Sequence, residues 1–221
     1  MGDQVVNSWL ISVEPLRKGN TEGREFVETH FARRARRRPL DRAQHELVTG
    51  ALLGDGTLLR TTSGWCFRVH HGLAQRRYVD FKYDLLREYV QSPPRQCGSA
   101  YYFRTVTHPA FSDYREYFYR SNRKVVPIEL LREQLSDLGL AIWLMDDGGA
   151  DGSAIRLNTQ SFTESENEAL ASLLRTTFGL DVRLNRDKGA FRLRVAAASM
   201  RRLIEIVGRH IHPDMFYKLS L

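Results

Sequence analysis

Two stretches of this sequence are strongly apolar and end in the same way. Residues 47–56 read LVTGALLGDG, and residues 138–149 read LGLAIWLMDDGG. Each stretch is apolar nearly all round, which predicts a buried helix rather than an amphipathic surface helix. Each then stops at an Asp-Gly step, and Gly is the usual residue just past a helix end. We therefore expect two matched helices in the protein interior.

Local signals around the first stretch support a helix there. Asp41 is a suitable N-cap, and Gln44 follows three positions later, as in a capping box. Gly50 and Gly54 are four residues apart and so lie on one face of the helix. Because glycine has no side chain, the backbone of another helix can approach closely at that face.

Similar segments follow each of the two helices, which indicates an internal duplication. In the first unit, alternation and helical periodicity predict strands at 57–61, 65–71 and 100–107 and helices at 73–90 and about 111–120. In the second unit they predict strands at 154–160, 181–186 and 190–196 and helices at 164–177 and 198–210. Asp147 lies 92 residues after Asp55. We expect two halves, 39–130 and 131–221.

Residues 1–38 are predicted to form a basic extension that precedes the first half. The segment ends in five arginines within 33–38, followed by Pro39. A solvated flexible arm and an arm that contacts phosphate groups are equally good interpretations of this run.

The composition favours a polyanionic partner inside a cell. Lys and Arg number 33 against 26 Asp and Glu, a net charge of +7, and a basic domain of this size most often binds nucleic acid. A basic protein without such a partner is the alternative. The sequence lacks an apolar run of about 18 residues and a charged-then-apolar leader, so we expect no membrane span and no secretion. Cys66 and Cys97 are far apart, which fits a reduced, intracellular protein.

One face of the predicted strands carries Arg, Asn and His, without acidic residues. These residue types read base edges and hold phosphate groups, so the face is predicted to contact DNA or RNA. A solvated sheet face is the alternative. The candidate contacts are Arg60, Arg68, His70, Arg104, Arg156, Asn158, Arg183, Asn185, Arg192 and Arg194.

Asp55 and Asp147 are predicted to lie at helix C-termini, where the helix dipole is already negative. A hard divalent cation would offset this unfavourable arrangement. Carboxylates together with the unsatisfied carbonyls of the last turn, those of Gly54 and Asp146, suit Mg²⁺. A single Asp-Gly step is better explained as a helix-ending turn, but two on matched buried helices favour a metal site.

Two of the five lysines follow the same repeat. Lys124 lies 69 residues after Asp55, and Lys218 lies 71 residues after Asp147, in a chain that otherwise uses 28 arginines. A lysine can change its pKa and move or orient a proton, whereas arginine stays charged. Two unrelated surface lysines are the alternative explanation.

The sequence resembles the LAGLIDADG homing endonucleases, and most closely their single-chain, intron-encoded type represented by I-SceI. The resemblance rests on residues 48–56 and 140–148, the paired nine-residue signature of that family, with Gly149 after it, and on four further segments in the family's order. These are residues 92–94, 122–127, 157–163 and 215–219. Residues 1–38 are not covered.

The resemblance implies an α+β fold of two pseudo-symmetric αββαββα halves, with the signature helices at the centre and a saddle of β-sheet over DNA. It implies a monomeric enzyme that uses Mg²⁺, with Mn²⁺ as a substitute, to cut both strands of a DNA target across the minor groove, leaving short 3′ overhangs. Asp55 and Asp147 would hold the metal ions and a water molecule, and Lys124 and Lys218 would polarise that water or steady the charge of the transition state. Gln160 falls where the family has a polar residue that positions solvent, and His71 is its nearest counterpart in the first half.

Two other functions remain open. The family also includes RNA maturases, which bind RNA during intron splicing and need not cut DNA. A DNA-binding regulator is the third possibility, but it would need neither the acidic pair nor the lysine pair. The expected location is a bacterial or archaeal cytoplasm or an organelle matrix.

Overall fold

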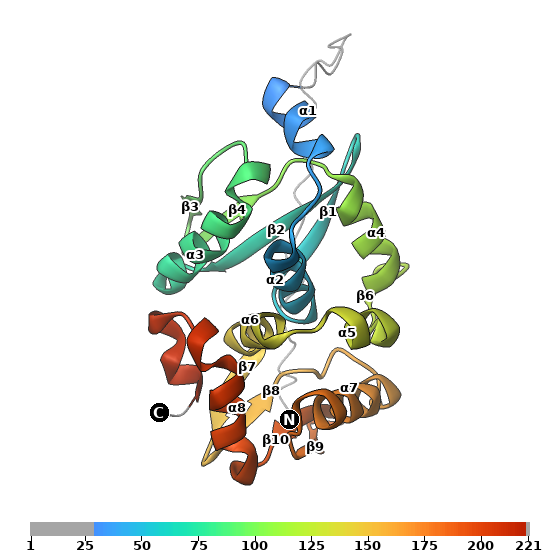
Figure 1. The fold of residues 1–221 in the computed structure, drawn as a ribbon, viewed down its shortest axis with the longest axis vertical. Helices are drawn as coiled ribbons and strands as arrows, with labels where there is room; N and C mark the ends of the chain where they lie inside the picture. Colours follow the sequence, from blue (N-terminus) through green and yellow to red (C-terminus); the bar gives the residue numbers. More distant parts are fainter. Residues whose placement is uncertain (1–28, 220–221) are drawn as a thin grey trace, which may run out of the picture.

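The computed structural model describes residues 29–219 and shows an α+β fold (Figure 1). Most of the extension expected at 1–38 therefore lies outside the described residues. Its last part forms a helix, α1 (His30–Arg37), which sits at one end of the molecule in Figure 1. No described helix has both the length and the apolar character needed to span a membrane.

Two units of the same construction follow α1. The first contains α2 (Arg42–Leu53), β1 (Thr57–Thr61), β2 (Gly64–Gly72), η1 (Leu73–Gln75), α3 (Arg76–Leu86), η2 (Arg87–Tyr89), β3 (Arg95–Cys97), β4 (Ala100–Arg104), α4 (Pro109–Phe118), β5 (Tyr119–Arg120) and β6 (Arg123–Lys124). The second contains α5 (Ile128–Gln134), α6 (Asp137–Asp147), β7 (Gly148–Asp151), β8 (Ala154–Leu157), α7 (Glu164–Phe178), β9 (Val182–Asp187), β10 (Ala190–Val195), η3 (Ala197–Ser199), α8 (Met200–Val207), η4 (Gly208–His210) and η5 (Pro213–Leu219).

Each unit carries one four-stranded antiparallel sheet with the same strand order. The first sheet runs β1-β2-β4-β3 and the second runs β7-β8-β10-β9. In Figure 1 the first unit occupies the upper part of the molecule and the second the lower part, and α2 and α6 meet between them. The repeated strand order confirms the expected α+β fold of two pseudo-symmetric halves around two central helices.

The two signature helices pack against each other at glycine. A Cβ atom at Gly50 would overlap the backbone carbonyl of Gly139, and one at Gly54 would lie 2.6 Å from the Cβ atom of Asp146. Leu47, Ala51 and most other residues of α2 and α6 are fully buried. The close approach of the two helices therefore depends on these glycines, and it brings the two helix C-termini together.

The helix starts agree with the local sequence signals. The Asp41 side chain accepts a hydrogen bond from the backbone N–H of Gln44, and the Gln44 side chain accepts one from the backbone N–H of Asp41, each at 2.9 Å. At the start of α6, the Ser136 side chain accepts a hydrogen bond from the N–H of Gly139. Both signature helices are therefore capped by side chains of their own sequence.

The structure differs from the expected elements in several places. Strand β7 was not expected because glycines at 148 and 149 have low strand propensity; it forms because residues 148–151 pair with β8. Strand β8 ends at Leu157 rather than at 160, since the N–H of Thr159 turns back to the carbonyl of Leu157. The short elements β3 and α5 were also missed.

Candidate active site and nucleic-acid interface

The C-terminal ends of α2 and α6 place Asp55 and Asp147 at the centre of the molecule. Gly54 is the C-cap of α2, so Asp55 follows directly, and Asp147 is the last residue of α6. Gly54 and Asp146 hold matching positions, each preceding one of these aspartates, and they touch where the helices meet. Both aspartates thus occupy the end of a helix where its dipole is unfavourable for a carboxylate.

Burial and mutual repulsion make these carboxylates hard to ionise. Burial, followed by the negative charge of Asp146, raises the pKa of Asp55 to about 6. Burial, followed by the charges of Asp55 and Asp146, raises the pKa of Asp147 to about 7. Since three carboxylates crowd one place, a divalent cation bound there would relieve their repulsion.

The two lysines reach the same helix ends in matching ways. Lys124 Nζ donates to the carbonyl oxygen of Gly54 at 2.7 Å. Lys218 Nζ donates to the carbonyl oxygen of Gly148 at 2.8 Å and to that of Asp146 at 3.5 Å. The carbonyls of Gly54 and Asp146 were expected to be unsatisfied, but each accepts a hydrogen bond from a lysine. Each retains a second lone pair that a metal ion could use.

Burial also affects the chemistry of the first of these lysines. It lowers the pKa of Lys124, although the charges of Asp147, Asp146 and Asp55 counteract the shift. A buried ammonium with a lowered pKa gives up a proton more readily than a solvated one. This behaviour suits a group that exchanges or orients a proton.

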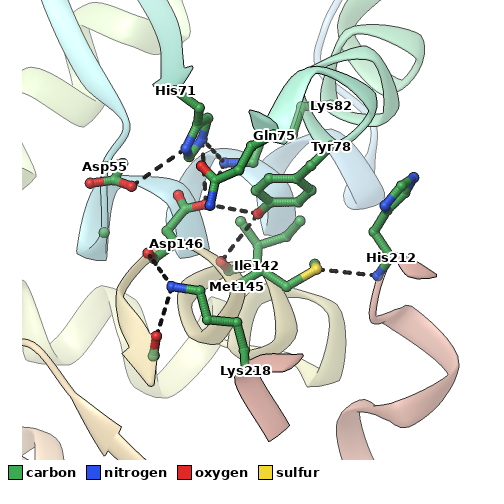
Figure 2. A network of polar contacts seen from close by, with 12 residues as sticks. Asp55, His71, Gln75, Tyr78, Lys82, Ile142, Met145, Asp146, His212 and Lys218 are labelled. Carbon is green, nitrogen blue, oxygen red and sulfur yellow. Dashed lines mark hydrogen bonds and ion pairs between the residues drawn. The ribbon is translucent and has the colours of Figure 1, made fainter. Parts of the chain in front are cut away.

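A buried ion pair between the two units was not predicted from the sequence. Figure 2 shows Lys82 of α3 and Tyr78 beside Asp146. Lys82 Nζ lies 2.6 Å from Asp146 Oδ1, and the Tyr78 hydroxyl donates to the same oxygen at 2.7 Å. The side chains of Lys82 and Asp146 are fully buried. One feature of the sequence points to this ion pair: Lys82 stands among apolar residues in the helix predicted at 73–90, where a lysine must find a buried partner.

His71 links this ion pair to Asp55. Its Nδ1 atom lies 3.5 Å from Asp55 Oδ2, and its Nε2 atom lies 3.2 Å from Lys82 Nζ. Burial, followed by the charge of Lys82, lowers the pKa of His71 to about 4, so the ring is neutral at pH 7. One side-chain oxygen or nitrogen atom from each of Asp55, His71 and Asp146 lies within 4.8 Å of the other two.

Gln160 is placed differently from His71. The side chain of Gln160 donates to Asp187 at 3.0 Å, in the β9–β10 hairpin. Thr57 pairs with Arg68 in the first sheet as Gly149 pairs with Arg156 in the second, so Arg68 corresponds to Arg156. Strand β8 ends at Leu157, however, and the chain turns before residue 160, so strand pairing does not test the correspondence of His71 with Gln160, which stays a prediction.

The donor atoms at the helix ends fit a hard divalent cation. Carboxylate and carbonyl oxygens predominate there, and these are the ligands that Mg²⁺ prefers. Asp146 Oδ2 is buried yet has no hydrogen-bond partner, which is an unusual situation for a charged oxygen. The residues present thus suit the ion that the sequence predicted.

Arginines from neighbouring strands face one another across the polar faces of both sheets. Arg68 pairs with Arg104 in the first sheet, and Arg156 pairs with Arg194 in the second. Arg194 is also opposite Arg183 on its other side. Like charges directly opposite each other destabilise a sheet. The matched arginines concentrate positive charge on these faces, which suits an anion such as a row of phosphate groups.

The polar face of the second sheet also carries acidic residues, which the sequence analysis had excluded. Arg194 pairs with Asp151 at 2.8 Å, and Arg192 pairs with Asp187 at 3.3 Å. Asp151 belongs to β7, a strand that the sequence does not predict, and Asp187 lies one residue past the predicted end of β9. An anion that binds these arginines must therefore compete with a carboxylate.

The structure brings nine of the ten candidate contacts to the polar faces or their margins. These are Arg68, His70, Arg104, Arg156, Asn158, Arg183, Asn185, Arg192 and Arg194. Arg60 is the exception, because it pairs with Trp65 on the opposite face of β1 and β2. Its guanidinium group lies over the Trp65 ring, 5.6 Å from the ring centre.

Known proteins resemble this chain in sequence and in fold. The model of the LAGLIDADG DNA endonuclease family matches residues 45–203. "Intron-encoded endonuclease ai4" of Dictyostelium discoideum is 37% identical over 123 residues, which cover 55% of this chain and 77% of that protein. "Cytochrome b mRNA maturase bI2" of Debaryomyces hansenii is 26% identical over 200 residues, 83% of this chain and 76% of that protein.

Two further comparisons concern coverage and fold. "Protein RecA" of Mycolicibacterium chitae is 31% identical over 194 residues, 80% of this chain, but the match spans only 46% of that protein. The solved structure of "the homing endonuclease I-WcaI bound to its DNA recognition sequence" superposes with a TM-score of 0.78 at 23% identity. It covers 87% of this chain and 93% of that one. This likeness confirms the fold.

Proposed function

Because this chain belongs to the LAGLIDADG DNA endonuclease family, we propose that it is a site-specific endonuclease that cuts both strands of a DNA duplex. The observation that carries this proposal is the pair of matching centres at the ends of α2 and α6. Each centre has one aspartate and one lysine, Asp55 with Lys124 and Asp147 with Lys218. Two reaction centres allow both strands to be cut in one binding event, and a regulator that only binds DNA would need neither.

The proposal includes the finer features that the sequence resemblance implies. The enzyme would be a single-chain homing endonuclease of two halves, 39–130 and 131–221, acting as a monomer and leaving short 3′ overhangs. Mg²⁺ would be the cofactor, and Mn²⁺ would replace it. The polar faces of the two sheets would hold the target duplex through their matched arginines.

The roles of the central residues follow from their positions. Asp55 and Asp147, with the carbonyl oxygens of Gly54 and Asp146, would hold the metal ions. A bound Mg²⁺ supplies neutralisation of phosphate charge and a water of lowered pKa. Lys124 and Lys218 each donate to a carbonyl oxygen at a helix end, so their ammonium groups can also orient solvent or steady a phosphate oxygen. His71, neutral at pH 7, lies beside Asp55 and can hydrogen-bond that carboxylate.

Cleavage selection tests the proposal directly. The protein is incubated with a randomised duplex library and Mg²⁺, and cut molecules are recovered and sequenced. We expect a single enriched site, cut on both strands in Mg²⁺ or Mn²⁺ and left intact in EDTA. A library that stays uncut in both metals at all protein concentrations overturns the nuclease proposal.

A maturase function is the second candidate, and one observation favours it: a relative that covers most of this chain is named an mRNA maturase. A maturase of this fold can bind RNA and leave duplex DNA intact. The same incubation distinguishes the two functions, because an enzyme cuts the selected duplex at substoichiometric concentration. The retained aspartates and lysines favour the nuclease.

Replacing Arg194 tests the proposed DNA surface. We expect Arg194→Gln to weaken binding of the selected duplex by about 1–3 kcal/mol and relax one base preference if the guanidinium contacts a guanine. If it contacts phosphate, the slope of log affinity against log salt falls by about 1. Arg201→Gln is the matched control, since Arg201 is 92% exposed on α8. Fluorescence anisotropy titrations at several salt concentrations measure both effects.

Asp151→Asn should strengthen DNA binding at the same surface, whereas Arg194→Gln should weaken it. Asp151 pairs with Arg194 in the free protein, so its removal frees the guanidinium and also removes repulsion of phosphate. We expect tighter binding of the duplex. If Arg194→Gln changes neither affinity nor preference and Asp151→Asn has no effect, this face does not contact DNA.

Replacing either lysine is expected to slow cleavage of one DNA strand only. Lys218→Met should slow cleavage of one strand by about 10²-fold, the typical cost of losing one transition-state donor. Nicked plasmid should then accumulate ahead of linear product, with binding retained. Lys124→Met is the matched control, and its nick should fall on the opposite strand. Strand-specific end labels on gels locate the nicks. If Lys218→Met linearises plasmid at the wild-type rate, Lys218 has no part in the reaction.

A further inference from the structure

Helix α1 presents a dense group of arginines to solvent. Arg33, Arg34 and Arg37 are exposed, and we call these three residues the α1 arginine face. The opposite side of the helix packs inward through Ala35, which is buried, and Phe31. The first turn of α1 contains no acidic residue. The helix therefore carries concentrated positive charge on one side and is anchored on the other.

Several hydrogen bonds hold α1 and the segment after it in place. The Thr29 side chain bonds to that of Gln91 at 3.3 Å, and Arg36 Nε donates to the carbonyl oxygen of Thr107 at 3.3 Å. The next residues are also fixed, because the Tyr89 hydroxyl donates to the carbonyl oxygen of Pro39 at 2.8 Å. The described part of the arginine run is thus a docked helix rather than a flexible arm.

A cavity of about 480 Å³ shows which side of the first sheet α1 borders. The residues that line it include Ala32 and Arg36 of α1. They also include Arg95 of β3 and Tyr102 and Arg104 of β4, and the latter two pair with His70 and Arg68 on the polar face. Helix α1 thus lies beside the polar face of the first sheet near the β1–β2 turn, where Thr61 and Ser63 also line the cavity. Its exposed arginines are on the neighbouring side of the helix.

We infer that the α1 arginine face binds backbone phosphates of the DNA duplex beyond the end of the first sheet. This inference rests on the proposed DNA function and adds a contact region outside the two sheets. An eight-residue helix is about 12 Å long, which is the span of about three to four phosphates along one strand. Guanidinium groups suit phosphate because they donate two parallel hydrogen bonds. The contact would add affinity without sequence preference.

A triple substitution of the α1 arginine face, Arg33→Gln with Arg34→Gln and Arg37→Gln, tests the inference. Arg36 stays, because its hydrogen bond to Thr107 holds the helix. The matched control removes the same charge from three exposed arginines elsewhere: Arg42→Gln, Arg132→Gln and Arg201→Gln. Their side chains are 89%, 60% and 92% exposed, and each pairs with a glutamate three or four residues along its own helix.

Binding is measured on the duplex recovered by cleavage selection, with Ca²⁺ in place of Mg²⁺ to prevent cutting. We expect the triple variant to lose about 2–3 from the slope of log affinity against log salt, since each phosphate contact contributes about 0.9. Its hydroxyl-radical footprint should shorten by about three to four nucleotides at the end held by the first half. The control should keep the wild-type footprint, and both variants should cut at the wild-type rate when saturating.

The test separates this inference from the proposed function. If the triple variant keeps the wild-type salt slope and footprint, the α1 contact is overturned even though the wild-type protein cuts DNA. If selection yields no cut duplex, the nuclease proposal fails. The salt slopes of the wild-type protein and the triple variant are then compared on a random duplex. Equal slopes overturn the α1 contact, and a smaller slope for the variant supports it. Circular dichroism confirms that the variant is folded.

Discussion

Asp55→Asn and Asp147→Asn should each abolish double-strand cleavage while leaving specific DNA binding intact. The carboxylates at the ends of α2 and α6 would hold the metal ions, whereas the sheets would hold the duplex. Loss of one carboxylate should reduce cleavage of its strand by at least about 10³-fold, as when a group acting only in the transition state is removed. Plasmid cleavage followed over time on gels, with anisotropy for binding, measures both properties.

The control for this prediction is Asp113→Asn. Asp113 is exposed on α4, away from the two helix ends, so the variant should cut like the wild-type protein. A protein that carries both Asp55→Asn and Asp147→Asn and still linearises plasmid would contradict the assignment of these residues to the reaction centres.

Asp55→Asn and Asp147→Asn should each be more stable than the wild-type protein when no metal is present. The pKa of each carboxyl is raised in the folded state, to about 6 for Asp55 and about 7 for Asp147. Ionisation therefore costs stability, and this cost grows as pH rises from about 4 to about 7, then stays constant. The gain in Tm of each Asn variant should therefore be absent near pH 4, increase up to about pH 7 and then stay constant. Thermal melts from pH 4 to pH 8 in EDTA measure it.

Lys82→Met should destabilise the fold by about 3–5 kcal/mol, the usual cost of breaking a buried ion pair from one side. Asp146 would remain fully buried with its ammonium partner gone, and its Oδ2 atom already lacks a hydrogen bond. Urea denaturation measures the loss. Lys188→Met is the control, because Lys188 is exposed in the β9–β10 turn.

A double variant separates charge from packing in this prediction. Lys82→Met combined with Asp146→Leu removes both charges, so most of the lost stability should return. If Lys82→Met alone costs less than about 1 kcal/mol, the ion pair is not an important link between α3 and α6. If the double variant is as unstable as the single one, packing of the lysine chain rather than its charge is responsible.

Much of the architecture could be predicted from local patterns. The apolar stretches ending in Asp-Gly predicted the central helices, and the alternation in 181–186 and 190–196 predicted the β9–β10 hairpin. Glycine-containing strand β7 and short strand β3 escaped prediction because their pairing partners, rather than their own residues, stabilise them. The acidic residue Asp151 was missed for the same reason, since it faces Arg194 only once β7 exists.

The sequence by itself determined the two signature helices, their caps, the duplication, and the matched spacing of Asp55 with Lys124 and of Asp147 with Lys218. These features depend on residues close in the chain or on repetition, so they can be read without coordinates. Only the tertiary structure decided that Lys82 pairs with Asp146, 64 residues away and in the other half. It also decided that His71 lies between Asp55 and Lys82, and that Arg36 of α1 lines a cavity beside the polar face. Pairing across halves, strand register and helix docking depend on how distant segments pack, and a linear pattern does not encode that geometry locally.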